Sequence, residues 1–217
     1  MKTSKTIIKK TITIFAVAMT LFCSTSSLVS CSKNDDDPLP IESPKLLEYS
    51  LIVESIANNE STTNKCFINL YDGILYNKAE ALANSNKVDL AYNYGSNGRF
   101  FESVNGMSGR TGYVRNWSTI TNSKIKAMLT TISALEFDNL KTNEDISNLF
   151  AAKSITIGTG DNFNNGVISG VNDLATSIVL AFTDKNSKTG FIKIGNYTAN
   201  VPFEDKALLP IQIKISK

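Results

Sequence analysis

The chain has 217 residues, among them 22 lysines and arginines, 20 aspartates and glutamates, and no histidine. The absence of histidine excludes Ser-His-Asp and Cys-His nucleophile systems, the HExxH zinc site and histidine ligation of haem. Four of the basic residues lie within the first ten positions, which leaves 18 basic residues against 20 acidic ones in the rest of the chain. The sequence therefore offers no broad positive field for a nucleic acid.

The first 30 residues have the pattern of a secretory signal peptide. Lysines without acidic residues precede an apolar run from Thr11 to Phe22. This run is shorter than the roughly 18 to 20 apolar residues of a permanent membrane-spanning helix. We therefore predict that residues 1–30 are an export signal and are removed.

The residues around Cys31 indicate a lipid anchor. The stretch "LVSC" at 28–31 resembles the lipobox of bacterial lipoproteins, and "SKNDDD" at 32–37 resembles the lipoprotein export signal of Bacteroidota. The resemblance implies that Cys31 is acylated, becomes the first residue of the mature chain, and holds it in the outer membrane facing the cell exterior. Two or more acyl chains suffice for stable anchoring. Prolines and acidic residues then predict a flexible tether over 31–44.

Beyond the tether, the chain alternates apolar and polar residues in a way that predicts six or seven strands. They include residues 46–55, a hairpin around Asp72-Gly73, residues 87–94, a second hairpin around 184–190, and a last strand containing Ile211, Ile213 and Ile215. Thr142 and Asp145 form a capping box that begins a helix, and 78–83 suits a shorter helical turn. We predict one mainly β globular domain over 45–217, either β-sandwich-like or α+β with one or two short helices.

Cysteine usage leaves a single thiol in this domain. With Cys23 removed and Cys31 acylated, Cys66 has no partner for an intramolecular disulfide. It lies in "KCFINLY", which alternates like a strand. We expect Cys66 to be a small core residue.

The segment 92–117 differs in composition from the rest of the chain. It contains all three arginines, the only tryptophan and five glycines. Arginine and aromatic side chains together suit carboxylates, sugars or flat conjugated rings. The candidate ligand-binding residues are Arg99, Phe101, Met107, Arg110, Arg115 and Trp117. The alternative is a long hairpin or surface loop whose aromatic residues cover the sheet.

Glu136 and Asp138 are weaker candidates, as a pair of catalytic acids. Two residues apart, they would face the same side of a strand, where two carboxylates can divide acid and base roles as in glycosidases. Paired acids on an exposed strand are the more common occurrence. We therefore predict no catalytic residue and no metal site.

Two stretches resemble known proteins. The stretch "FINLYDGILYNKAEALANSNKVDLAYNYG" and the closing "IVLAFTDKNSKTGFIKIGNY" with "PIQIKISK" resemble a group of uncharacterised Bacteroidota surface lipoprotein domains. This resemblance implies a fold and a location, and no reaction. A fainter similarity links the same stretches to HmuY-like haem-carrying lipoproteins. Because histidine is absent, only methionine-ligated members are comparable, with Met107 and Met128 available here.

These observations lead to a functional expectation. The protein is expected to be an outer-membrane, surface-facing lipoprotein acting as a non-catalytic binding or structural module, with a glycan, a small molecule or another surface protein as partner. The first alternative is a haem carrier, with Met107 as iron ligand and Arg99, Arg110 or Arg115 near the propionates. The second is a glycan-processing enzyme. No other cofactor is expected.

Overall fold

The computed structural model describes residues 44–54, 63–95, 98–107, 114–127, 132–161, 163–164, 178–195 and 208–217. All of them belong to one compact unit, Ile41–Lys217. The predicted signal peptide, Cys31 and the tether up to residue 43 lie outside the described residues.

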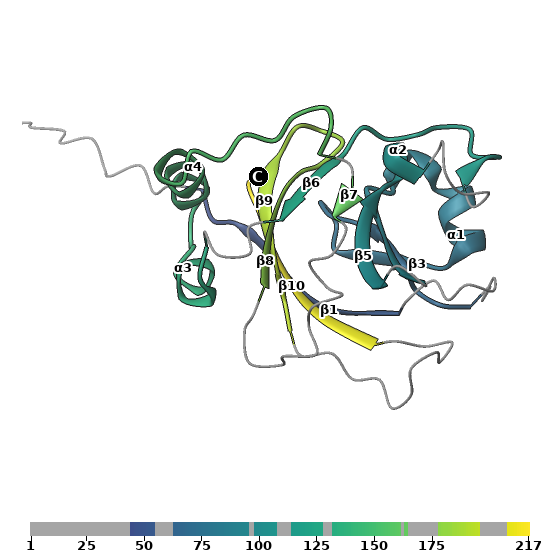
Figure 1. Ribbon diagram of the computed structural model, residues 1–217, viewed down its shortest axis with the longest axis horizontal. Coiled ribbons are helices and arrows are strands. Elements are labelled where there is room, and N and C mark those ends of the chain that lie inside the picture. Colours follow the sequence, from purple (N-terminus) through teal and green to yellow (C-terminus); the bar gives the residue numbers. More distant parts are fainter. Residues whose placement is uncertain are drawn as a thin grey trace, which may run out of the picture. The chain divides into compact units, whose positions relative to one another are not determined.

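The described strands form two antiparallel sheets (Figure 1). The first sheet has the order β1 (Leu47–Glu54), β10 (Leu208–Ile215), β9 (Thr189–Ile194), β8 (Ile178–Thr183) and β6 (Lys124–Ala127). The second has the order β3 (Ile74–Tyr76), β2 (Phe67–Asn69), β4 (Leu90–Gly95), β5 (Gly98–Ser103) and β7 (Phe163–Asn164). The first and last strands of the domain are neighbours, with Ser50 opposite Gln212.

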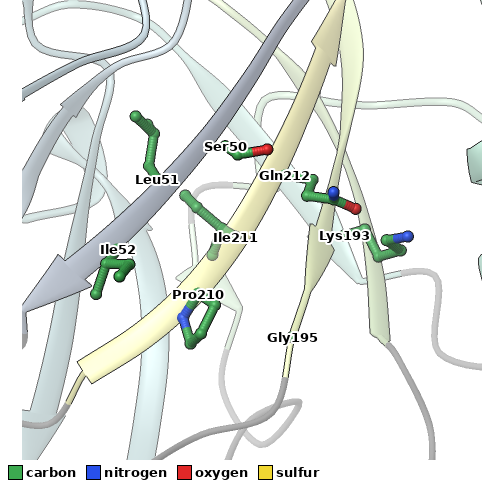
Figure 2. Close-up of a pocket in the computed structure, with 8 residues that line it drawn as sticks. All are labelled: Ser50, Leu51, Ile52, Lys193, Gly195, Pro210, Ile211 and Gln212. Atoms are coloured by element: carbon green, nitrogen blue, oxygen red, sulfur yellow. The ribbon is translucent and has the colours of Figure 1, made fainter.

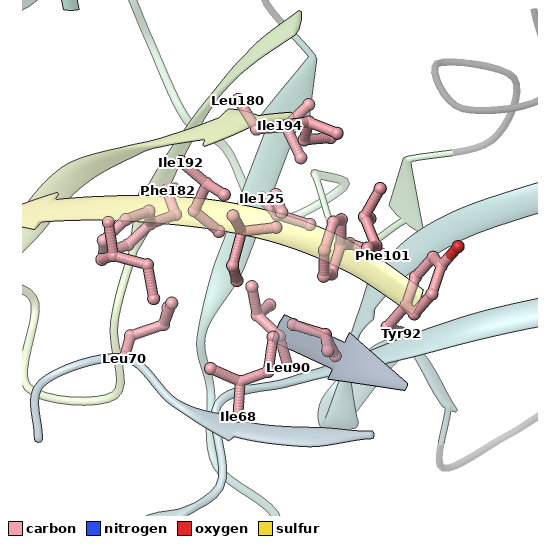
Figure 3. Close-up of a cluster of buried hydrophobic side chains, with 14 of the residues drawn as sticks. Ile68, Leu70, Leu90, Tyr92, Phe101, Ile125, Leu180, Phe182, Ile192 and Ile194 are labelled. Carbon is pink, nitrogen blue, oxygen red and sulfur yellow. The ribbon is translucent and has the colours of Figure 1, made fainter. Parts of the chain in front are cut away.

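The inner faces of the two sheets share one core (Figure 3). Ile68, Leu90 and Tyr92 of the second sheet pack in the same cluster as Leu180 and Ile192 of the first. Every second residue of a strand points to the same face, which is why the alternation in the sequence becomes a buried layer. The prediction of a mainly β domain is confirmed, and the arrangement is that of a sandwich.

Short helices cover parts of both outer faces (Figure 1). α3 (Ala134–Asp138) and α4 (Asn143–Ala152) pack on the outer face of the first sheet, with Phe137 and Ile146 against Phe191. On the second sheet, α1 (Lys78–Ala83) and α2 (Val104–Met107) bury a separate cluster, and η1 (Ser85–Lys87) follows α1. The described residues thus hold more helices than the predicted one or two.

The helices begin where the side chains cap them. The predicted capping box of Thr142 and Asp145 is confirmed at α4, and the predicted turn at 78–83 is α1, capped by Asn77. The same signal stands at Ser133 and Glu136, where it begins α3, a helix that the alternation alone did not predict. The strand predicted over 87–94 begins only at Leu90, because 85–87 form a 3-10 turn.

Both predicted hairpins are present, and each depends on a glycine. Gly73 has φ +64°, and a Cβ there would lie 2.3 Å from the Tyr49 ring. A Cβ on Gly190 would lie 2.4 Å from the carbonyl oxygen of Lys214 and 2.5 Å from the Phe182 ring. A side chain at Gly190 would push β10 away, and one at Gly73 would displace the Tyr49 ring.

Candidate functional site

The predicted binding residues do not gather at one place in the described structure. Phe101 lies in the sandwich interior, where its ring centroid is 5.3 Å from that of Tyr92. Met107 and Trp117 lie on the opposite side of the second sheet, in the cluster beneath α1 and α2. Arg115 is exposed, while Arg110 and the side chain of Arg99 lie outside the described residues. The sheet therefore separates Phe101 from Met107 and Trp117.

The cluster that contains Met107 is closely packed. Met107 is fully buried with Val104 and Ala91, and the Trp117 ring lies 5.3 Å from that of Phe67. Cys66 belongs to the same cluster, and burial raises the pKa of its thiol to about 12. The prediction that Cys66 is a core residue is confirmed. These contacts give Met107 and Trp117 a packing role on the outer face of the second sheet.

The expectation that Glu136 and Asp138 share one face of a strand is wrong. Both lie on α3, where residues two apart point about 200° apart around the helix axis. Glu136 pairs with Lys153 at 2.7 Å, and Asp138 pairs with Lys193. The Lys153 ammonium, together with hydrogen bonds from Ser133, lowers the pKa of Glu136 to about 2. A carboxyl group with this pKa is ionised near neutral pH and is a poor proton donor.

A groove lies on the outer face of the first sheet, beside α3. It consists of two hollows of about 310 and 390 Å³ that share Ser50 and Gln212, and we call it the outer groove. The first hollow is polar and reaches Asp138, the last residue of α3, and Lys141, which lies just beyond it. The second is mainly apolar and reaches Ile52 and Pro210 (Figure 2).

Three strands supply the middle of the outer groove. Ser50 of β1 is opposite Gln212 of β10, and Gln212 is opposite Lys193 of β9, so the three side chains form a row across the sheet (Figure 2). One step further along, Ile52 is opposite Pro210. Ile52 keeps 60% of its surface exposed. Both rows face outward because outward positions recur every second residue of a strand.

The charged groups around the polar hollow are largely bound to the protein itself. Lys214 is buried, and its Nζ donates to the carbonyl oxygens of Leu140 at 2.7 Å and Asp138 at 3.2 Å. Burial lowers the pKa of this ammonium group. Lys193 and Lys214 both lie 5.2 Å from the centre of the Phe137 ring, so two cations flank one aromatic ring. Both lysines beside the hollow are thus held by contacts within the protein.

A second polar cluster lies inside the domain, around Asp89. This fully buried carboxylate accepts hydrogen bonds from the backbone N–H of Leu70 at 2.9 Å, from Ser123 Oγ at 2.5 Å and from the backbone N–H of Lys185 at 3.0 Å. Lys185 Nζ lies 3.7 Å from it. These donors come from both sheets. Burial raises the pKa of the neighbouring Asp184, whose carboxylate accepts from the backbone of Lys188.

The residues of the outer groove and of the Asp89 cluster were not predicted from the sequence. Ser50, Gln212 and Lys193 have the ordinary pattern of an outward strand face, and nothing local shows that their strands are adjacent. Asp89 gave a weak signal, because an aspartate directly before the buried strand β4 needs donors from elsewhere in the fold.

The described residues contain no group of three or more histidine, cysteine, aspartate or glutamate side chains that could hold a metal ion. In the same part of the chain, no helix combines the length and the apolar character needed to cross a bilayer. Comparisons with protein-family models, with curated proteins and with solved structures find no match for this chain.

Proposed function

We propose that this protein is an outer-membrane lipoprotein, anchored through Cys31 and facing the cell exterior, whose sandwich domain is a non-catalytic binding module. The anchor is supported by the lipobox and by the acidic export signal after it. Pro44, the last residue of the proposed tether, is bound to the domain, since its carbonyl oxygen accepts a hydrogen bond from the backbone N–H of Asn143 at the start of α4.

Metabolic labelling tests the anchor. Radiolabelled palmitate is expected to enter the wild-type protein and not the Cys31→Ala variant, and intact cells treated with protease are expected to lose the domain. Label in both proteins, or protection from protease in intact cells, would contradict the anchor or its orientation. The Cys66→Ala variant is the matched control, because it removes a buried cysteine and leaves Cys31 in place.

The binding surface in this proposal is the outer groove. The main support is the row of Ser50, Gln212 and Lys193 on paired strands. The apolar pair of Ile52 and Pro210 lies beside this row. Side chains on strands are held more precisely than side chains on loops, which favours recognition. The carboxylates nearby are engaged in ion pairs, which supports binding without catalysis.

The chemistry of the outer groove favours a neutral ligand with hydroxyl groups. Lys193 is paired with Asp138, and Lys214 with backbone carbonyls. The side chains of Ser50 and Gln212 make no hydrogen bond within the described residues, so a hydroxyl and an amide remain for a ligand. A sugar combines hydroxyl edges with apolar faces, which suits this row and the adjoining Ile52 and Pro210. We therefore propose a neutral glycan.

A panel of neutral oligosaccharides, tested against the full chain on an array and then by titration, examines this proposal. Gln212→Ala is expected to weaken binding of any retained oligosaccharide at least tenfold. Asn86→Ala removes an exposed amide on η1, on the side of the second sheet, and is expected to change nothing. Absence of binding across the panel, or equal loss in both variants, would overturn the glycan assignment.

The haem alternative gains no support from the described residues, because the thioether of Met107 is buried among apolar side chains.

A further inference from the structure

A second row of outward positions crosses the first sheet beside the row that contains Gln212. Ile52 of β1 is opposite Pro210 of β10. The backbone N–H of Gly195, directly after β9, donates to the carbonyl oxygen of Pro210 at 2.8 Å, so Gly195 continues the row on the far side (Figure 2). These three residues all line the apolar hollow of about 390 Å³. The row therefore ends at a position without a side chain.

The glycine at position 195 keeps the apolar hollow open. A Cβ at this position would lie 3.2 Å from the Cβ of Pro210. Directly opposite residues of two paired strands place their side chains on the same face of the sheet, so a larger side chain here would extend over the Pro210 ring. Gly195 does not have a positive φ, so its backbone conformation does not require glycine. What glycine provides here is the space beside Pro210.

Pro210 also leaves an acceptor without its strand partner. Directly opposite residues that share one backbone hydrogen bond in an antiparallel pair normally share a second, in which the N–H of residue 210 would donate to the carbonyl oxygen of residue 195. Proline has no backbone N–H and cannot make this bond. Gly195 is partly exposed, and its carbonyl oxygen accepts no hydrogen bond from the described residues. This oxygen therefore remains for a donor on a ligand.

The groups around the apolar hollow match an acetamido substituent. Such a group has a methyl, a carbonyl that accepts and an N–H that donates on the opposite side, because its amide is trans. With a hydrogen bond of about 2.9 Å at each end and about 2.3 Å between its N and O atoms, it bridges groups up to about 8 Å apart. Gln212 and Gly195 are diagonal neighbours on paired strands, which are typically about 7 to 8 Å apart.

We infer that the outer groove selects glycans that carry an N-acetylated amino sugar, an inference that rests on the proposed binding of a neutral glycan. The acetamido carbonyl accepts from the Gln212 amide, and its N–H donates to the carbonyl oxygen of Gly195. The methyl group lies in the apolar hollow against Ile52 and Pro210. A hydroxyl group at the same position of the sugar is too short to reach both polar groups, and it leaves the apolar hollow unfilled.

Matched pairs of oligosaccharides, titrated against the full chain, test this selectivity. The members of a pair share every linkage and differ only in a hydroxyl or an acetamido group next to the anomeric carbon, as in tetramers of glucose and of N-acetylglucosamine. In each pair that the protein binds, the acetamido member is expected to bind at least about tenfold more tightly. Equal affinity within the bound pairs would overturn this inference and leave glycan binding intact. Absence of binding to every member would overturn both.

Gly195→Val tests the hollow itself. Valine occupies the space beside Pro210, so the preference for the acetamido member is expected to fall at least about fivefold. Gly195→Ala adds only the Cβ and is expected to give an intermediate preference. Gly160→Val is the matched control, because nothing lies within 4 Å of a Cβ at Gly160, and it is expected to keep the wild-type preference. An unchanged preference in both Gly195 variants, or the same loss in the Gly160 variant, would overturn the inference.

A competition measurement separates an amino sugar from an amide alone. Free N-acetylglucosamine is expected to displace the bound acetamido oligosaccharide. N-acetylalanine amide carries the same acetamido group without a sugar, and it is expected to need a concentration at least about tenfold higher. Equal displacement by the two compounds would show that the groove recognises an acetylated amide without its sugar, and would overturn the assignment to an amino sugar.

Discussion

The carboxylate of Asp89 lies in the interior of the domain, whereas the carboxylates of α3 lie on its surface. Asp89 is fully buried at the junction of the sheets and accepts from Leu70, Ser123 and Lys185. Glu136, with 36% of its side chain exposed, pairs with one lysine on the surface. Lys214 is intermediate, a nearly buried cation held by two carbonyls.

The difference shows that depth decides what a charge contributes. A buried carboxylate with several donors holds segments together, because its removal leaves those donors without acceptors. An exposed pair is surrounded by water that competes for each partner. Three variants test this order.

Replacement of Asp89 is expected to have the largest effect. Asp89→Ala leaves the buried backbone N–H of Leu70, the partly buried backbone N–H of Lys185 and the Ser123 hydroxyl without their acceptor, beside the Lys185 ammonium. The free energy of unfolding in urea is expected to fall by about 3 to 5 kcal/mol. Asp89→Asn keeps the size and one acceptor oxygen, so its loss is expected to be intermediate. A loss under about 1 kcal/mol for alanine would contradict the assigned role.

Lys214→Met is expected to have a moderate effect. Methionine keeps much of the apolar stem but leaves the carbonyls of Asp138 and Leu140 at the end of α3 without a donor. The expected cost is about 1 to 3 kcal/mol in the same urea measurement. Lys126→Met, on an exposed lysine that also donates to a carbonyl, is the matched control and is expected to cost less. Equal costs would show that burial does not separate the two lysines.

Glu136→Gln is expected to have the smallest effect, visible mainly as pH dependence. The pKa of Glu136 is lowered from 4.5 to about 2 in the fold, so its contribution is present above pH 4.5 and is lost as the pH falls toward 2. The variant is expected to unfold at a temperature close to that of wild type near neutral pH, and to lose less stability over this acidic window. An unchanged acid profile would contradict the Lys153 pairing.

Features that depend on residues close together in the sequence could be predicted, and features that depend on distant residues could not. The capping box at Thr142 and the turn at Gly73 depend on residues within a few positions, and both could be predicted. α3 was not predicted, although "SALE" carries the same local capping signal, because two acids two residues apart also fit an exposed strand. The outer groove could not be predicted, since Ser50 and Gln212 meet only after strands at the two ends of the domain pair.

The sequence by itself determined which residues of each strand face inward, where the two hairpins turn and where α4 begins, because these depend on local backbone geometry and side-chain alternation. Only the tertiary structure decided that β1 lies beside β10 at a sheet edge and that donors from both sheets converge on Asp89. Strand order is fixed by burial of both sheets in one core, and that burial involves residues more than a hundred positions apart.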